Sequence, residues 1–376
     1  MSLLNLLTEK NNYFFDTLQR MQNNGNPLVL YGAGCLGEMT WNFLARQNIQ
    51  LDYVALNRAY ISVGADFHGI PVIAIEDLIA NKTAFNGIVA LQHVTPELSA
   101  TLSEAACEVL IYDPAFIGVN TNLWYTPEFC EENSEVLNQF YEQLADEKSK
   151  RTLVAFLNQR LSAKRGPYHS VYEPKHYFPL DVVQLEEGEV FVDCGAYDGD
   201  SINAFMQEFE AQGFVQPENI IGFEPDVDNF NKLVANTAYI KSCLCVNKGV
   251  WHEEARLYFQ SGLALSSRLS DEAAAGESIA LTSIDNILQG KKATFIKMDV
   301  EGAELNALRG AEITIREHSP VLAISVYHKP EDLITIPQFV QSVNAGYKFY
   351  LRAHHPELAF ELVFYAIPED RWVGKS

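Results

Sequence analysis

The chain has 376 residues, of which 48% are hydrophobic and 20% are charged, and its formal net charge is −22. This length is sufficient for two ordinary domains, each with its own core. Because an acidic surface repels phosphate backbones and anionic lipids, we expect neither nucleic acid nor membrane as a partner.

The expected location also follows from the composition. No stretch approaches the roughly 18 apolar residues that cross a bilayer, and the N-terminal residues lack the basic start of a signal peptide. The six cysteines form no C-x-x-C pair, as in proteins of a reducing compartment. We therefore expect a cytoplasmic protein, and the sequence is compatible with a homo-oligomer.

Strands alternate with helices along residues 1–120, which predicts a doubly wound, Rossmann-like α/β domain with a parallel sheet. A helix is expected to begin near Thr95, which precedes a proline and a glutamate. The expected strands are an apolar run before Gly32, the start of the segment 68–80, and the segments 51–56, 87–92 and 108–113.

A glycine-rich turn follows the first of these strands. Gly32, Gly34 and Gly37 fit the G-x-G-x-x-G pattern of dinucleotide-binding turns. The acid expected at the end of the next strand is missing, because Asn57 and Arg58 stand there. Two interpretations stay open for this domain: a binding or recognition module, and a fold kept for its packing.

Residues 121–184 are expected to connect two domains. Polar helical patterns with narrow apolar stripes run through 127–165 without a strand signal, which indicates connecting helices. The aromatic segment that follows either closes over a ligand as a lid or packs the junction between the domains. Its relevant side chains are those of Tyr172, His176, Tyr177 and Phe178.

Strands and helices alternate again in residues 185–376. Two final apolar runs, 347–352 and 361–367, are joined by too few residues for a crossover helix, so they are expected to form an antiparallel hairpin. His354 and His355 fall in its loop and are expected to be solvated. The remaining expected elements are strands near 190–194, 220–224, 243–247, 294–298 and 321–326, and helices near 200–211, 226–236, 282–289 and 302–317.

The strongest local signal is VFVDCGAYDGDS at 190–201. An apolar strand ends at Asp193, Gly195 opens a turn, and Gly199 precedes a helix whose N-terminal N–H groups could bind an anion. The acid at the strand end suits a ligand that also carries a positive ammonium group.

Two further strands end in acids. Glu224, at the tip of the second strand, could accept both ribose hydroxyls of a nucleoside, or cap the next helix. Asp299 and Glu301 follow a buried strand in FIKMDVEGAELNALRGAE, where they either face a ligand or cap a helix. With only two carboxylates evident and no third ligand fixed by spacing, we expect no metal site.

The motifs DCGAYDGDS, GFEPD and KMDVEGAELNALRGA together resemble the FkbM family of methyltransferases over about residues 185–368. The resemblance implies a class I methyltransferase sheet, S-adenosylmethionine as cofactor, and O-methylation of a hydroxyl on a sugar, glycolipid or polyketide-like small molecule. The cofactor-binding residues that it implies are Asp193, Gly195, Ala196, Tyr197, Gly199, Asp200, Ser201, Glu224, Pro225, Lys248, Gly249, Val250 and Asp299.

An O-methyltransferase also needs a group that takes the hydroxyl proton. His328, after the fifth strand and with a pKa expected near neutrality, is the candidate base, and Asp299 competes with it. The expected partner is a small-molecule or glycan hydroxyl. Two alternatives are an NAD(P)-linked oxidoreductase, which would explain only the N-terminal glycine turn, and a non-catalytic nucleotide-binding protein.

Overall fold

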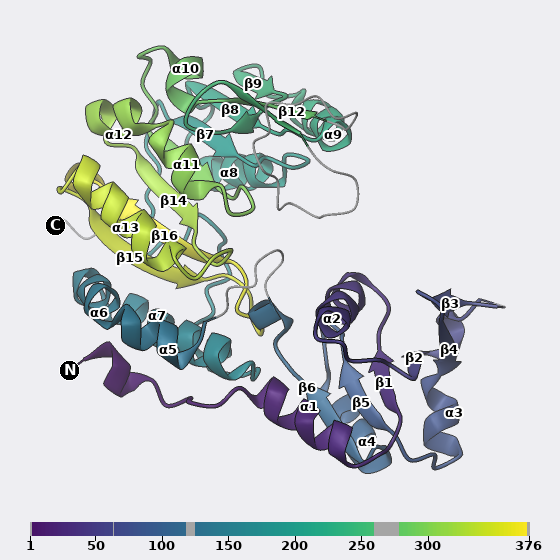
Figure 1. Cartoon of the computed structure of the whole chain (residues 1–376). Helices are drawn as coiled ribbons and strands as arrows, with labels where there is room; N and C mark the ends of the chain where they lie inside the picture. The colour runs from purple at the N-terminus through teal and green to yellow at the C-terminus, as the bar shows by residue number, and fades with distance from the viewer. Residues whose placement is uncertain (1, 63, 118–124, 259–277, 374–376) are drawn as a thin grey trace.

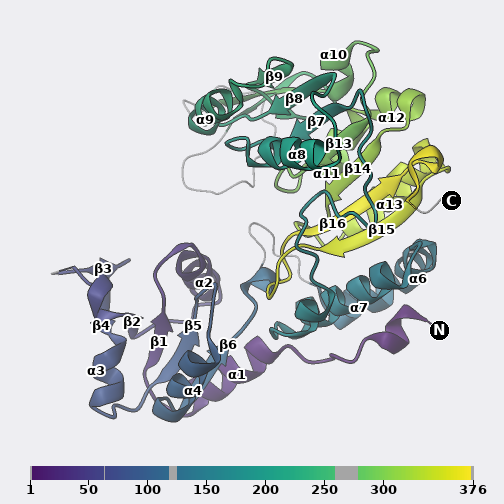
Figure 2. The same ribbon diagram turned by 180° about the vertical axis from the view of Figure 1, so that it is seen from behind.

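The computed structural model describes residues 2–62, 64–117, 125–258 and 278–373. Two sheets form two lobes that are joined by a group of helices (Figure 1). Figure 2 shows the N-terminal segment passing along these joining helices before it enters the N-terminal lobe. In the described ranges, no helix is both long and apolar enough to cross a membrane.

The N-terminal lobe contains a six-stranded sheet in the order β3-β4-β2-β1-β5-β6. Its neighbouring strands are parallel, except that β3 pairs antiparallel with β4. The expected doubly wound fold is confirmed. Its strands are β1 (Leu28–Tyr31), β2 (Tyr53–Leu56), β3 (Asp66–Phe67), β4 (Ile70–Ala74), β5 (Asn86–Val89) and β6 (Glu108–Ile111).

Helices cover both faces of this sheet. Phe14 and Phe43 belong to one apolar cluster, and Leu78 and Leu102 to another, because alternate strand residues face opposite sides. The last helix is capped by the Thr95 hydroxyl, as its sequence predicted. These helices are α1 (Tyr13–Asn23), α2 (Cys35–Arg46), α3 (Ile75–Ala80) and α4 (Pro96–Ala105).

The joining helices are α5 (Pro127–Glu132), α6 (Ser134–Gln143) and α7 (Glu147–Ser162). Asp113, which follows β6, is buried at their junction with both lobes. Its carboxylate accepts hydrogen bonds from the Gln159 side chain of α7 at 2.7 Å and from the Ala359 backbone N–H of the C-terminal lobe at 2.8 Å. One buried carboxylate thus bonds to all three parts of the chain.

The C-terminal lobe contains a seven-stranded sheet in the order β15-β16-β14-β13-β7-β8-β9. The last five are parallel, and β16 pairs antiparallel with both β14 and β15, which confirms the expected hairpin. The strands are β7 (Val190–Cys194), β8 (Asn219–Phe223), β9 (Cys243–Val246), β13 (Phe295–Met298), β14 (Val321–Ser325), β15 (Lys348–Ala353) and β16 (Leu362–Ile367).

Helices α8 (Asp200–Ala211), α9 (Val227–Thr237) and α10 (Ile284–Leu288) lie where they were expected. The single helix expected at 302–317 is instead two, α11 (Glu304–Arg309) and α12 (Glu312–His318). The Asp285 carboxylate accepts from the Ile313 and Thr314 N–H groups, which starts α12 as a separate helix.

Several elements were not anticipated. Helix α13 (Asp332–Val343) covers the sheet, and a small second sheet has the order β10-β12-β11. The strands of that sheet are β10 (Gly249–Val250), β11 (Ala255–Tyr258) and β12 (Ser278–Thr282).

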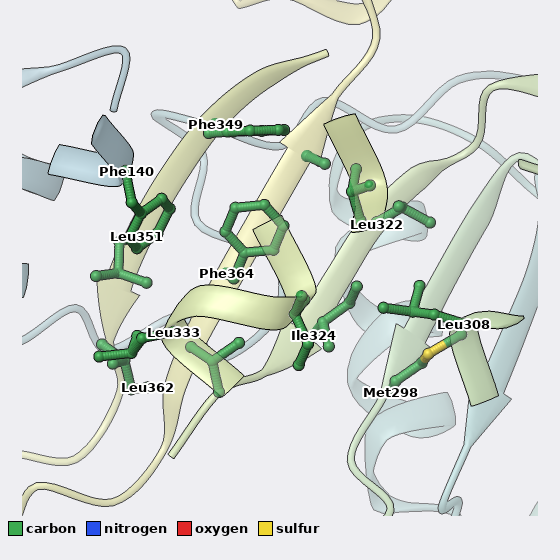
Figure 3. Packing of buried hydrophobic residues seen from close by; sticks show 14 of the residues in the cluster. Phe140, Met298, Leu308, Leu322, Ile324, Leu333, Phe349, Leu351, Leu362 and Phe364 are labelled. Atoms are coloured by element: carbon green, nitrogen blue, oxygen red, sulfur yellow. The ribbon is translucent and has the colours of Figure 1, made fainter. Parts of the chain in front are cut away.

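The largest apolar cluster lies between the C-terminal sheet and the helices on one of its faces. Figure 3 shows Phe364 of β16 surrounded by side chains from neighbouring strands and from α13. Phe140 of α6 joins the same cluster and packs against Phe364 with ring centroids 5.9 Å apart. The joining helices are therefore part of the C-terminal core.

One sequence expectation about the hairpin loop was wrong. His354 is buried, and its ring nitrogens contact the Glu173 carbonyl and the Tyr365 hydroxyl, each at 2.8 Å. The loop folds back onto the segment that precedes β7, so it is not solvated at this point. His355 is half-buried and accepts hydrogen bonds from the N–H groups of residues 357 and 358.

Candidate active site

A cavity of about 1240 Å³ lies at the carboxyl ends of the parallel strands of the C-terminal sheet. The turns after β7, β8, β13 and β14 contribute to its lining, which is where ligands bind in open α/β sheets. Trp251, Leu257, Ile279 and Leu281, from the small second sheet and its first loop, line it as well.

The turn after β7 lies very close to the end of the neighbouring strand β13. Gly195 has φ +78°, and a Cβ at this position would collide with the carbonyl oxygen of Asp299. Only glycine combines that left-handed backbone with so close a contact. Gly195 therefore joins the exits of β7 and β13 at the bottom of the cavity.

Glu224 follows β8 and is only 7% exposed. One of its carboxylate oxygens accepts from the Tyr197 N–H at 2.9 Å, and the other accepts from the Asp226 N–H at 2.8 Å. Burial raises the pKa of Glu224, while these N–H groups act against the rise. Each oxygen keeps a second lone pair, so a ligand with two adjacent hydroxyls can still bind here.

Asp193, the acid at the end of β7, is fully buried and forms an ion pair with Lys297 of β13 at 3.0 Å. The Ser201 hydroxyl also donates to its carboxylate. Burial alone would lower the pKa of Lys297, but the Asp193 and Asp299 carboxylates raise it. Lys297, rather than Asp193, therefore lines the cavity.

Asp299 follows β13 and lines the cavity. One of its oxygens accepts a hydrogen bond of 2.9 Å from the Tyr177 hydroxyl, and the other lies 3.5 Å from the Tyr327 hydroxyl. Tyr177 comes from the aromatic segment before β7, so this segment reaches the site. Phe178, its neighbour, is buried in the core instead. The segment thus contributes to both the cavity and the packing.

His328 lies among carboxylates at the same end of the cavity. Its Nε2 atom is 3.6 Å from both Asp299 and Glu301, and its Nδ1 atom is 3.0 Å from Glu304. Burial opposes its protonation, but these three carboxylates raise the pKa of His328 to about 10. The sequence-based expectation of a pKa near neutrality was therefore wrong.

The third carboxylate that the sequence argument lacked is Glu304, the first residue of α11. Asp299, Glu304 and His328 each offer a ligand atom, and these atoms lie within 4.8 Å of one another. Glu304 is completely buried, although the sequence pattern around it predicted an amphipathic helix. The structure thus brings together a set of potential metal ligands.

Most of the residues expected at the site do line the cavity. They are Gly195, Tyr197, Asp200, Ser201, Glu224, Pro225, Gly249, Val250, Asp299 and His328.

Four expected cofactor residues do not line the cavity. Asp193 faces Lys297, and Ala196 is buried in the core beside α8. Gly199 faces α9, and Lys248 extends toward Glu254, 3.2 Å away.

Sequence reasoning missed Lys297, Glu304 and Glu361. A lysine within the apolar strand FIKM was a usable signal, because an ammonium group in a core needs a charged partner. Glu361 precedes β16 and reaches the cavity only because the hairpin folds next to β14. Strand order is not visible in the sequence, so that residue carried no signal.

In the N-terminal lobe, the glycine turn is explained at least in part by packing. A Cβ at Gly37 would collide with the Gly32 carbonyl, and a Cβ at Gly32 would lie 2.6 Å from the Ala90 carbonyl. Asn57 accepts a hydrogen bond from the Tyr31 hydroxyl, where a nucleotide-binding acid would otherwise stand.

Comparison with known proteins agrees with this architecture. Residues 193–349 match the family model described as "Methyltransferase FkbM domain". No curated protein matches the sequence significantly. The crystal structure of methyltransferase FkbM from Methylobacillus flagellatus KT is similar with a TM-score of 0.74 at 24% identity, covering 93% of each chain. The fold is therefore shared over nearly the whole chain.

Two other solved structures resemble the chain much less. An rRNA methylase from Streptococcus thermophilus has a TM-score of 0.32 at 12% identity, covering 49% of this chain and 89% of its own. Aeropyrum pernix fibrillarin in complex with S-adenosyl-L-methionine has a TM-score of 0.31 at 10% identity, covering 48% and 67%. Neither bears on function at such TM-scores. The chain thus contains a region, residues 193–349, that matches the FkbM methyltransferase domain.

Proposed function

We propose that this protein is an S-adenosylmethionine-dependent O-methyltransferase that acts on a hydroxyl of a small molecule or glycan. The observation that carries the proposal is the position of Glu224. Its two oxygens are fixed by backbone N–H groups at the exit of β8 and face a cavity large enough for a nucleoside. A carboxylate held in this way can accept both hydroxyls of a ribose.

The charge of the cavity also fits this cofactor. Among the described residues, six carboxylates but only two lysines line it. S-adenosylmethionine carries a sulfonium and an ammonium against one carboxylate, so its net positive charge is attracted by such a cavity. The lining acids are Asp200, Glu224, Asp226, Asp299, Glu301 and Glu361.

Aromatic side chains stand close to these acids. Tyr177 and Tyr327 line the cavity beside Asp299, so they could contact a sulfonium through their ring faces. The bound cofactor would supply an activated methyl group, which an acceptor oxygen takes while the carbon–sulfur electron pair stays on sulfur. The protein therefore has to orient the oxygen and receive its proton.

Asp299 is the better of the two candidate proton acceptors. His328 is already protonated near neutral pH, because its pKa is about 10, and a protonated ring cannot accept another proton. Asp299 is held by Tyr177 at a strand exit and lines the cavity. In the absence of other ligands, His328 would serve to position the carboxylates around it.

The proposed function also gives each of the three parts of the chain a role. Residues 185–376 would form the methyltransferase domain, and residues 121–184 would connect the lobes and contribute Tyr177 to the site. Residues 1–120 would recognise the acceptor or stabilise the assembly. The buried contacts of Asp113 support a fixed relation between these three parts.

The proposal is tested by calorimetric titration of the full-length chain with S-adenosylmethionine and, separately, with NAD and NADP. We expect binding of the first alone, and at least about tenfold weaker binding by Glu224→Gln, since a bidentate charged hydrogen bond is lost. The matched control is Glu218→Gln, an exposed residue at the opposite end of β8. Undiminished binding by Glu224→Gln would reject the site.

Catalysis requires a second assay. Release of S-adenosylhomocysteine in the presence of sugars, glycolipids and phenolic or polyketide-like alcohols would identify the acceptor class. A chain that binds the cofactor but releases no product with any hydroxyl acceptor would instead be a binding protein, and the enzymatic part of the proposal would be wrong.

A further inference from the structure

We infer that Asp299, Glu304 and His328 form a binding site for one divalent metal ion, in the same cavity as the proposed cofactor site. The three residues come from the exit of β13, the start of α11 and the loop after β14. Their ligand atoms converge within 4.8 Å of one another. Two carboxylates and an imidazole at this spacing can bind a single ion together once the ion has displaced the proton of His328 into solvent.

The second observation is a set of buried polar atoms without hydrogen bonds. The His328 side chain is only 5% exposed, and neither of its ring nitrogens makes a well-aligned hydrogen bond, although Nδ1 lies 3.0 Å from Glu304. The Oε2 atom of the fully buried Glu304 also lacks one. Buried polar groups are normally paired, so unsatisfied atoms on two residues of one cluster indicate that a ligand can bind there.

The surrounding contacts resemble the support that metal ligands require. The Tyr177 hydroxyl orients Asp299 through a hydrogen bond of 2.9 Å. The other oxygen of Glu304 accepts from the N–H groups of Val300 at 3.0 Å and Gly302 at 3.2 Å. Such outer contacts fix the direction of ligating carboxylates before an ion arrives.

The negative charge around the three residues also favours the binding of a cation. Glu301 and Glu361 line the same part of the cavity, so four carboxylates face one imidazole and two lysines, and one of these lysines is paired with Asp193. Burial, together with repulsion from Asp299, raises the pKa of Glu361 to about 7. A divalent ion would relieve that repulsion.

The mixture of ligands narrows the choice of ion. An imidazole nitrogen with two carboxylates suits Mn²⁺, Fe²⁺, Co²⁺ or Zn²⁺ better than Ca²⁺, which prefers oxygen ligands alone. Three protein ligands leave coordination positions open for water or another oxygen. Because Asp299 and His328 line the cavity, these positions would face its interior.

The consequence for chemistry rests on the proposed methyl transfer. An acceptor hydroxyl bound to the ion would become more acidic, and its oxygen would be oriented toward the methyl group. Asp299 would then be a metal ligand rather than the proton acceptor. The proton would pass to Glu301 or Glu361, the carboxylates that remain in the cavity.

The site is tested on full-length protein stripped with EDTA and then dialysed. Free Mn²⁺ gives a sharp electron paramagnetic resonance signal that disappears when the ion is bound, so titration with MnCl₂ counts the sites. We expect one ion per chain, and competition by ZnCl₂. Binding of no ion by a chain that is folded by circular dichroism would overturn the inference.

Substitutions decide where the ion binds. Glu304→Gln keeps an oxygen for the two backbone N–H groups, and His328→Asn keeps a polar side chain, so both are expected to fold. Each should weaken Mn²⁺ binding at least about tenfold. The matched control, Glu312→Gln, changes an exposed carboxylate of α12 that contacts Arg316, and it should bind as the unaltered chain does.

If Glu304→Gln and His328→Asn both bind Mn²⁺ as tightly as the control, the ion lies elsewhere and the assignment is wrong. Calorimetry with S-adenosylmethionine, performed on the same EDTA-treated protein, reports separately on Glu224. Loss of Mn²⁺ binding with retained cofactor binding would support the metal site. Failure of cofactor binding with retained Mn²⁺ binding would reject only the proposed function.

Discussion

The ammonium group of Lys297 lies 3.0 Å from the carboxylate of Asp193, and both side chains are almost completely removed from solvent. The same ammonium group donates a hydrogen bond of 2.7 Å to the Gly195 carbonyl. One buried ion pair therefore connects the central strands β7 and β13 and fixes the turn that forms the bottom of the cavity.

Removing one partner of this ion pair should destabilise the folded protein. Lys297→Met leaves the Asp193 carboxylate buried without its counter-charge, so we expect a loss of about 3–5 kcal/mol in the free energy of unfolding. The double variant Lys297→Met with Asp193→Asn removes both charges and should recover part of the loss. Urea unfolding measures all three proteins. A double variant less stable than Lys297→Met would contradict this account.

Gly195→Ala tests the contact between the exits of β7 and β13. The new Cβ would collide with the Asp299 carbonyl in a backbone of φ +78°, so we expect a loss of at least about 3 kcal/mol in stability, or failure to fold. Gly213→Ala is the matched control, with φ +93° and open space, and should cost about 1–2 kcal/mol. Equal losses in thermal or urea unfolding would show that the contact is unimportant.

Local patterns in the sequence indicate where strands end, but not which strands become neighbours in the sheet. Asp193, Glu224 and Asp299 each stand at or just after the end of an apolar strand, so their places at one edge of the sheet could be predicted from strand ends alone. The directions in which these three side chains point could not be predicted in this way. Asp193 and Lys297 are 104 residues apart, and their pairing depends on β7 and β13 being neighbours.

The group of carboxylates around His328 could not be predicted either, because it also depends on contacts between distant segments of the chain. One helix was expected near 302–317 and Glu304 was given no role, whereas Glu304 is the buried first residue of α11 and lies 3.0 Å from His328. The pKa of His328 depends on carboxylates from another segment of the chain, so no local pattern could give it. Local patterns therefore located the site but left its electrostatics undetermined.

Tyr177→Phe tests the contribution of the segment before β7. The substitution removes the hydrogen bond of 2.9 Å to Asp299 but keeps the buried ring. A hydrogen bond to a charged group is worth roughly 1.5–3 kcal/mol, so we expect kcat for the proposed methyl transfer to fall at least about tenfold. S-adenosylhomocysteine release measures it. Tyr172→Phe, in an exposed position of the same segment, should leave kcat unchanged, and equal effects would exclude a specific role for Tyr177.

Acid stability provides a prediction that does not depend on function. Burial lowers the pKa of His354 to about 4, although the Glu173 carbonyl, which lies 2.8 Å from its Nδ1 atom, acts against this fall. The unfolded chain binds this proton near pH 6.5. The stability contributed by the neutral ring is therefore fully present above about pH 6.5 and is lost as the pH falls toward about 4.

His354→Gln keeps an acceptor for Tyr365 and removes the titration. Between pH 6 and 4.5, the free energy of unfolding of the unaltered chain should fall more steeply than that of the variant, by up to about 1.4 kcal/mol per pH unit. Urea unfolding at several pH values measures the slopes. His252→Gln, which changes an exposed histidine, should keep the steep slope. Parallel slopes for the unaltered chain and His354→Gln would show that His354 is charged in the folded protein or accessible to water, because a ring that burial keeps neutral adds to the fall in stability over this pH range.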